Sequence, residues 1–213
     1  MGKERKTNWA EMMGEAVREA TFSHSYGGED YFVFPFRCRR LSGAEDIINA
    51  IASRNTIENF DIKPGRRIGV NGEIRSYNNR SGTGSKLVIT VHVNEAFSGD
   101  HSEDYNRVML MGNLCRKPVY RRTPMGREIT DLLLAVNRSY GKADYLPCIV
   151  WGGMARRAAT WEVGDRVRLR GRLQSRTYIK IQNQEAVEKV AFEVSVMEIE
   201  RVSREEERWK SMG

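Results

Sequence analysis

The chain has 213 residues, of which 35 are Lys or Arg, 28 are Asp or Glu, and 40% are hydrophobic. This length exceeds one minimal domain, and this composition is too apolar for a disordered chain, so two small domains are expected. No apolar run approaches the roughly 18 residues of a membrane span, and Met1–Ala10 lacks the apolar core of a signal peptide. We therefore expect a cytoplasmic protein with no membrane partner.

Residue types that build metal or catalytic sites are few. The cysteines Cys38, Cys115 and Cys148 form no Cys-x-x-Cys pair, and the three histidines are too scattered to complete a zinc site with them. No carboxylate pair, Cys–His couple or phosphate-binding glycine loop is present, and Ser81–Ser85 is interpreted as a hairpin turn. We expect no catalytic residue, no metal and no cofactor, and hence a protein that is not an enzyme.

An internal repeat organises the chain. Residues 14–43 align without a gap on residues 112–141, at an offset of 98, and after one inserted residue Arg67–Ser76 mirrors Arg166–Ser175. This period exceeds the roughly 20 to 50 residues of a solenoid unit, so each copy is expected to have its own core. The pattern predicts two copies of one domain.

The first copy is predicted to consist of short strands. Within Asp46–Ser53, Ile47, Ile48 and Ile51 have helical spacing, which favours a helix, whereas the repeat favours a strand, and we follow the repeat. The polar stretch Phe97–Asp104 has turn chemistry and marks the boundary. The predicted division is a first domain over residues 1–103, a second over 104–202 and a charged tail over 203–213.

The second copy has a clearer strand pattern, with a turn at Thr123–Gly126. Alanines at helical spacing predict a short helix over Met154–Trp161, which ends before Gly164. Five strands with one helix between the third and fourth are typical of the OB-fold. The predicted fold class is all-β, with two tandem OB-fold five-stranded barrels, each with a short helix or loop between strands 3 and 4. The five predicted strands are Arg107–Leu114, Ile129–Asn137, Asp144–Trp151, Arg166–Leu173 and Ala191–Val196.

Alternation in the third of these strands separates two faces. Leu146, Cys148 and Val150 form an apolar face that suits the core, and the opposite face has Tyr145, Pro147, Ile149 and Trp151. Exposed aromatic rings among Lys and Arg suit stacking on unpaired bases. Tyr140 and Tyr178 lie near Arg138 and Arg176 and share this interpretation. The alternative for each ring is a place in the core or in a protein interface.

Basic charge is concentrated in the second copy. Residues 1–104 contain 14 Lys and Arg against 15 Asp and Glu, and the remaining residues contain 21 against 13. This asymmetry is typical of a polyanion-binding surface, although solubility alone also accounts for a net charge. Alternate arginines from Arg166 to Arg172 are interpreted first as a solvated face, with phosphate contact as the alternative. Trp161 is assigned to the core.

A series of motifs runs in order through roughly residues 105 to 200, including Asn106–Leu114, Lys117–Gly126, Leu134–Arg138, Ile149–Gly152 and Gly171–Tyr178. The series resembles the bacterial single-stranded DNA-binding protein family, whose OB-fold domains bind single strands. The resemblance implies that Tyr140, Tyr145, Trp151 and Tyr178 stack on DNA and that Arg121 and Arg176 contact phosphates. Arg122 and Arg138, next to these positions, complete the predicted nucleic-acid-binding set.

The sequence departs from the family pattern in three places. Arg122 replaces the usual tyrosine before Thr-Pro-x-Gly, which makes that hairpin more basic. The chain stops at Gly213 without the acidic, hydrophobic tip with which family members recruit replication and repair enzymes, so recruitment by that route is in doubt. Most members have one OB domain and assemble four, so two per chain imply a homodimer with four OB domains.

The first copy lacks the four aromatic positions. Through the repeat they correspond to Ser42, Ile47, Ser53 and Asn79. The prediction is that the first copy is mainly an assembly module, linked to the second at high effective concentration. The alternative is a weaker groove of its own, formed by Arg37, Arg39, Arg40 and Tyr77.

The sequence thus predicts non-enzymatic, sequence-tolerant binding of single-stranded DNA in replication, repair or recombination, in the bacterial cytoplasm at the nucleoid. One alternative is a primosome-type accessory protein, and another is a protein-interaction scaffold that uses the same OB surface. RNA is a second candidate ligand, because the choice between DNA and RNA depends on contacts to the 2′-hydroxyl.

Overall fold

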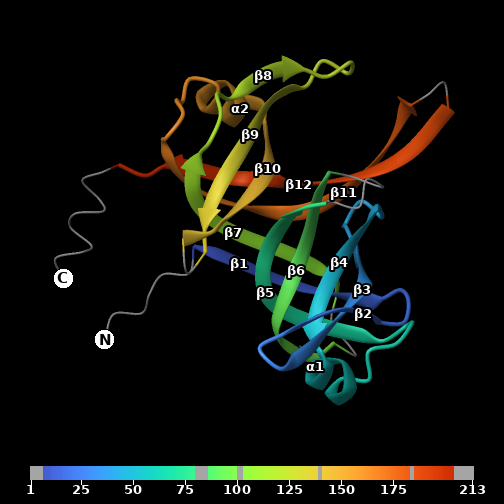
Figure 1. Ribbon diagram of the computed structural model, residues 1–213. Coiled ribbons are helices and arrows are strands. Elements are labelled where there is room, and N and C mark those ends of the chain that lie inside the picture. Colours follow the sequence, from blue (N-terminus) through green and yellow to red (C-terminus); the bar gives the residue numbers. More distant parts are fainter. Residues whose placement is uncertain (1–6, 80–85, 100–102, 139–140, 183–184, 204–213) are drawn as a thin grey trace. The chain divides into compact units, whose positions relative to one another are not determined.

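The computed structural model divides into two compact units (Figure 1). The unit termed N-terminal comprises Trp9–Arg107 and Leu173–Phe192, and the unit termed C-terminal comprises Met1–Asn8, Val108–Arg172 and Glu193–Gly213. Strands predominate in both, so the predicted all-β class is confirmed. The structure describes residues 7–79, 86–99, 103–138, 141–182 and 185–203.

The strands of the N-terminal unit form a closed barrel. Their order is β2-β3-β4-β6-β5-β1, and β1 also pairs with β3, so five strands close on themselves and β2 extends β3 as a hairpin. The β4–β6 pair is parallel and the β1–β5, β3–β4 and β5–β6 pairs are antiparallel. The elements are β1 (Asn8–Ala16), β2 (Thr21–Tyr26), β3 (Glu29–Arg39), β4 (Glu45–Ser53), α1 (Arg54–Asn59), β5 (Arg67–Asn78) and β6 (Leu87–Ser98).

The strand predicted at residues 46–53 is confirmed as β4. Burial alternates along it, with Ile48, Ala50 and Ala52 in the core. The helical spacing of its isoleucines is misleading because Ile51 is also buried, although it lies on the face opposite Ile48. β4 lies between β3 and β6 and is therefore a central strand. A central strand is apolar on both faces, so its pattern mimics that of a helix.

The C-terminal unit repeats this barrel. The strand order is β8-β9-β10-β12-β11-β7, β7 also pairs with β9, and the β10–β12 pair is parallel. The predicted strands and helix are present, with β8 as an additional short strand, and Trp161 is buried as predicted. The elements are β7 (Tyr105–Leu114), β8 (Val119–Arg122), β9 (Glu128–Asn137), β10 (Ala143–Trp151), α2 (Gly152–Ala158), β11 (Arg166–Gln182) and β12 (Glu185–Arg201).

β11 and β12 are much longer than predicted, and their distal halves belong to the N-terminal unit. This segment, Leu173–Phe192, is termed the arm. The Ser175 backbone N–H donates to Asp46 Oδ1 at 2.9 Å, and the Ile47 N–H donates to Ser175 Oγ at 3.1 Å. The arm is therefore anchored on the start of β4, within the N-terminal unit. The domain bounds at residues 103 and 202 stay predictions.

The repeat recurs as one buried ion pair in each barrel. Arg40 Nη2 lies 2.5 Å from Asp46 Oδ1 in the N-terminal unit, and Arg138 pairs with Asp144 through Nε and Nη2 in the other. The two carboxylates are almost completely buried. A buried charge needs a hydrogen-bonded partner, so each arginine is a structural requirement of its barrel.

Glycines recur where two barrel strands approach closely. A Cβ on Gly14 would lie 2.1 Å from the Arg37 carbonyl oxygen, and one on Gly112 would lie 2.3 Å from that of Ala135. Gly72 and Gly171 have the same relation to His92 and Ser195. The spacing of glycines in the repeat therefore reflects backbone contacts in the closed barrel, where no side chain fits.

Candidate nucleic-acid interface

β10 presents two aromatic rings on its outer face. Leu146, Cys148 and Val150 are buried in the core as predicted, while Tyr145 is 49% exposed and Trp151 is partly exposed. Ile149, expected on the outer face with them, is only 4% exposed. It pairs with Asp131 on one side and Ser195 on the other, so it lies between two neighbouring strands and not at a sheet edge.

The ring of Trp151 is held by a hydrogen bond. The indole Nε1–H donates to Ser195 Oγ on β12 at 3.2 Å, and Ser195 itself is buried. This bond satisfies the single donor of the indole, so orienting the ring leaves no polar group unpaired. A fixed and partly exposed ring on a sheet surface is suited to stacking against a planar ligand.

The two arginines on β8 that are predicted to bind nucleic acid are paired with carboxylates. Arg121 donates to both oxygens of Asp131, at 2.6 and 3.1 Å, and Arg122 lies 3.7 Å from Glu128. Both guanidinium groups are exposed, with 71% of the Arg122 side chain accessible. Exposed ion pairs contribute at most about 1 kcal/mol, so a phosphate is able to compete for these arginines.

Glu128 is the centre of the charge cluster at this hairpin. The Tyr120 hydroxyl donates to Glu128 Oε1 at 2.6 Å, and Arg156 of α2 contacts the other carboxylate oxygen. The Tyr120 hydrogen bond, and then the charges of Arg156 and Arg122, hold the pKa of Glu128 below its ordinary value. The carboxylate is thus ionised at neutral pH and offsets part of the positive charge of the hairpin.

Arg138 has a different environment. Its guanidinium pairs with the fully buried carboxylate of Asp144, and only 19% of its side chain is accessible. The geometry accounts for Arg138 as a structural residue, and its contact with nucleic acid stays a prediction. Tyr140 lies outside the described residues.

Tyr178 and Arg176 lie on the arm and therefore within the N-terminal unit. The Arg176 guanidinium lies 5.7 Å from the centre of the Tyr178 ring, which is within the range of a cation–π contact. Arg176 is exposed and Tyr178 is half-buried. Arg176 directly follows Ser175, which anchors the arm to β4, and Tyr178 lies two residues further along β11.

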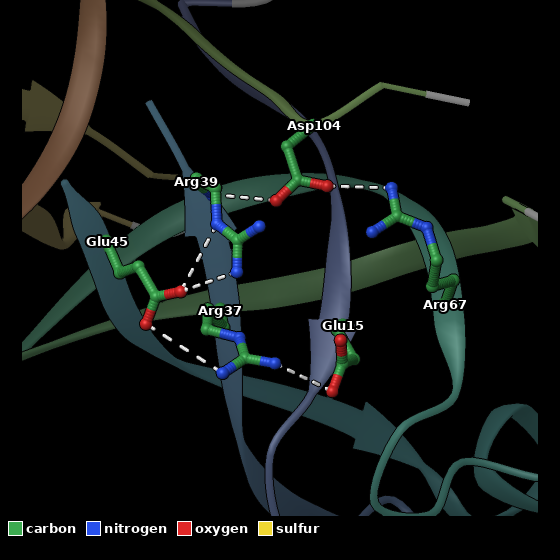
Figure 2. Close-up of polar contacts among 6 residues, drawn as sticks. All are labelled: Glu15, Arg37, Arg39, Glu45, Arg67 and Asp104. Atoms are coloured by element: carbon green, nitrogen blue, oxygen red, sulfur yellow. Dashed lines mark hydrogen bonds and ion pairs between the residues drawn. The ribbon is translucent and has the colours of Figure 1, made fainter. Parts of the chain in front are cut away.

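Arg37 and Arg39 of the N-terminal unit form ion pairs with carboxylates (Figure 2). Arg37 pairs with Glu15 at 2.9 Å and Glu45 at 3.8 Å, and Arg39 pairs with Glu45 at 2.9 Å. Arg40 is the partner of buried Asp46. The side chains of Arg37 and Arg40 are only 29% and 25% accessible, so a phosphate reaches them less easily than it reaches Arg121 and Arg122, whereas Arg39 forms an exposed pair like theirs.

Asp104, just before β7, extends this network. One carboxylate oxygen accepts the Arg39 backbone N–H at 2.7 Å, and the other accepts from Arg67 at 2.7 Å (Figure 2). The sequence analysis missed this residue, because nothing in a polar turn indicates which distant arginine it meets.

Aromatic contacts also occur in the N-terminal unit, at positions that the repeat did not indicate. Tyr31 lies between His24 and His92, with ring centres 5.1 and 5.5 Å away. The sequence repeat does not indicate these residues, because it compares matched positions along the chain and carries no information about which residues lie opposite on the neighbouring strands.

Two negative findings apply to the described part of the chain. No group of three or more His, Cys, Asp or Glu in it could hold a metal ion. No helix in it is both long and apolar enough to cross a membrane.

Comparisons with known proteins agree with this architecture. Residues 105–202 match the model of the single-strand binding protein family. The wild-type single-stranded DNA binding protein from Thermus aquaticus has a similar crystal structure, with a TM-score of 0.75, 22% identity and coverage of 92% of this chain and 93% of that one. At this identity the likeness shows the fold, and it extends over both barrels.

Curated sequence relatives also match part of the chain. A single-stranded DNA-binding protein from Halalkalibacterium halodurans is 38% identical over 80 residues, which are 34% of this chain and 48% of that protein. Single-stranded DNA-binding protein B from Bacillus subtilis is 36% identical over 97 residues, which are 42% of this chain and 83% of that protein. The chain spans about half the length of several curated relatives, and it spans most of the Bacillus subtilis protein. The chain belongs to the single-strand binding protein family.

Proposed function

We propose that the chain binds single-stranded DNA with little sequence preference, by stacking bases on Trp151 and Tyr145 and contacting phosphates through Arg121 and Arg122. The observation that carries the proposal is the Trp151 ring, oriented by Ser195 and partly exposed beside a hairpin of surface arginines. Every base has a π-face, so stacking tolerates any sequence, while the arginines supply a salt-dependent attraction.

The proposed role requires no chemistry on the nucleic acid. Burial raises the pKa of the Cys148 thiol, so this cysteine is protonated at neutral pH and is not an activated nucleophile. The protein then acts by holding a single strand, in the cytoplasm at the nucleoid, during replication, repair or recombination.

The test is a titration of intrinsic tryptophan fluorescence with oligothymidine and, separately, with a duplex of equal length, at low and moderate salt. Stacking on Trp151 should quench its emission with the single strand alone, and added salt should weaken binding. Trp151→Ala should abolish the quenching, whereas Trp151→Phe, which retains a ring, should preserve most of the affinity. An unchanged signal together with no shift in an electrophoretic mobility assay would refute the proposal.

Assembly is a second part of the proposal. Two barrels per chain would give four in a homodimer, with the N-terminal unit supplying contacts between OB domains. The limited exposure of Arg37 and Arg40 supports a role other than binding phosphate. Sedimentation equilibrium should give the mass of two chains, and a monomer at micromolar concentration would contradict this part alone.

Oligoribonucleotides extend the same assay. A polyuridine strand of equal length should compete with oligothymidine if stacking and phosphate contacts dominate, because neither reads the 2′-hydroxyl. Replication and repair proteins remain proposed partners, to be sought with the DNA complex.

A further inference from the structure

The N-terminal unit has a ring at the place of Trp151, on the neighbouring strand. Trp151 of β10 pairs directly with Ile129 of β9. The matched pair in the N-terminal barrel is Ser53 of β4 with Tyr31 of β3. Directly opposed residues of antiparallel strands share one face, with Cβ atoms about 4.5–5.5 Å apart. The two barrels therefore have an aromatic ring at the same location, on β10 in the C-terminal unit and on β3 in the N-terminal unit.

The residue that orients Trp151 also has an aromatic counterpart. Ser195 lies opposite Ile149 in the parallel β10–β12 pair, and His92 lies opposite Ile51 in the matched β4–β6 pair. The Tyr31 and His92 rings are 5.5 Å apart at an interplanar angle of 35°. A serine hydrogen bond in one barrel is thus replaced by a ring contact in the other.

A β-bulge adds a third ring. In the β2–β3 pair Phe22 lies opposite Phe32 and His24 lies opposite Tyr31, so the register shifts between them. The bulge brings His24 onto the face of Tyr31, where the rings stack at 5.1 Å and 10°. His24 is exposed, and Tyr31 and His92 are half-buried. These three residues are termed the ring row.

We propose that the ring row of His24, Tyr31 and His92 is a second stacking site for an unpaired base of single-stranded DNA. This inference rests on the proposed function. The match to the Trp151 and Ser195 positions supports this occupant, because it places a partly exposed group of rings at the same location on the barrel although the residues at the matched positions differ.

The electrostatics of this site differ from those of the C-terminal unit. Arg37, on the same face of β3, is bound to Glu15 and Glu45, so it adds little net charge. Affinity from the ring row should therefore come from stacking, with few counterions released. Loss of the ring row is expected to weaken binding without changing its salt dependence.

The experiment uses the full chain and fluorescein-labelled oligothymidine of about 30 nucleotides, longer than the site of a single OB-fold. Tyr31→Ala should weaken binding about fivefold or more, the lower end for loss of one stacked base. The slope of log affinity against log salt should stay at the wild-type value. Tyr31→Phe should restore affinity, and ultraviolet cross-linking should join thymine to a peptide containing His24, Tyr31 or His92.

Phe22→Ala is the matched control. Phe22 is an aromatic residue on β2, the strand of His24, and is 60% exposed. The bulge turns it toward Phe32 and away from the ring row. This variant should bind as the wild type does. Equal affinity of Tyr31→Ala and Phe22→Ala, with no cross-link in the three positions, would overturn the inference.

The outcomes separate this inference from the proposed function. A normal loss with Trp151→Ala and none with Tyr31→Ala rejects the ring row alone, whereas no loss with either variant rejects single-strand binding on both units. A change in sedimentation mass for Tyr31→Ala, with affinity per chain unchanged, would assign the face to contacts between copies and would also overturn the inference.

Discussion

Ser53 and Trp151 occupy the same position in two barrels of one fold but have different roles. Ser53 is the N-cap of α1, and its Oγ accepts the Thr56 backbone N–H at 3.2 Å. Trp151 is the N-cap of α2 and makes no side-chain capping bond, while its indole is bound to Ser195. One barrel uses the position to stabilise a helix and the other to expose a ring. The barrel tolerates either a serine or a tryptophan at this partly exposed position, so the role of the position differs between the two units.

The buried features do not show this freedom. Each barrel retains its Arg–Asp pair and its glycines at close strand approaches, although a partly exposed position such as that of Ser53 and Trp151 differs between the two. Unpaired buried charges and backbone clashes cost several kcal/mol, whereas exposed positions tolerate most residues. The comparison predicts equal sensitivity of the two units in their interiors and unequal sensitivity on their surfaces.

The largest effect is expected from the buried ion pairs. Arg138→Met leaves the Asp144 carboxylate buried without its partner, and Arg40→Met does the same to Asp46. Each should destabilise its own unit by about 3–5 kcal/mol. Hydrogen–deuterium exchange of peptides from each unit measures this loss separately. Arg121→Met, which breaks an exposed pair, is the control and should cost less than about 1 kcal/mol.

Glycine substitutions come next. Gly112→Ala and Gly14→Ala place a Cβ within 2.3 and 2.1 Å of a backbone oxygen, so each should cost about 1–3 kcal/mol. Urea unfolding should show both losses. Gly153→Ala, whose Cβ would meet only the Arg156 side chain at 3.7 Å, should be neutral or slightly stabilising. A neutral Gly14→Ala would mean that the N-terminal barrel is looser than its counterpart.

Ser53→Ala tests the divided use of the N-cap position. Loss of the bond to the Thr56 N–H should cost about 1 kcal/mol and increase amide exchange in α1, while affinity for oligothymidine stays unchanged. Ser53→Asp retains a capping oxygen and should preserve protection. Weaker DNA binding by Ser53→Ala would contradict the assignment of this serine to helix capping.

The smallest effect is expected from surface carboxylates. Glu128→Gln removes a carboxylate partner of Arg122 and Arg156, and Glu45→Gln removes one from Arg39 and the more distant of the two partners of Arg37. Each should raise affinity for single-stranded DNA by up to about fivefold at low salt, measured by anisotropy. Glu58→Gln, on α1 away from these arginines, should leave affinity unchanged. A gain with Glu128→Gln alone would mean that DNA does not reach the Arg37 face.

The lowered pKa of Glu128 gives the same prediction a pH dependence. A carboxylate with a depressed pKa in the folded state stabilises that state above its unfolded pKa, and this contribution is lost as pH falls through the lowered value. The same protonation releases Arg122, so DNA affinity should rise over this acidic range in the wild type. Glu128→Gln should show no such rise from this residue.

Much of the architecture was predictable because it follows local patterns. Period-two alternation located β10 and its core face, and the repeat correctly assigned residues 46–53 to a strand against their helical spacing. The exposed Tyr145 and the buried Trp161 follow from the same patterns. The predicted single-strand contacts of Tyr145 and Trp151 are still to be tested by the experiments above.

The sequence by itself determined the two barrels, their repeat and the location of the rings on β10, because strand periodicity and turn residues are local properties of the chain. Tertiary structure decided which residues meet: the burial of Ile149, the anchoring of the arm on Asp46, the pairing of Arg138, and the Tyr31–His92 contact that the matched positions concealed. These depend on the register of strands distant in sequence, and a side chain's partners are set by the neighbouring strand as much as by its own.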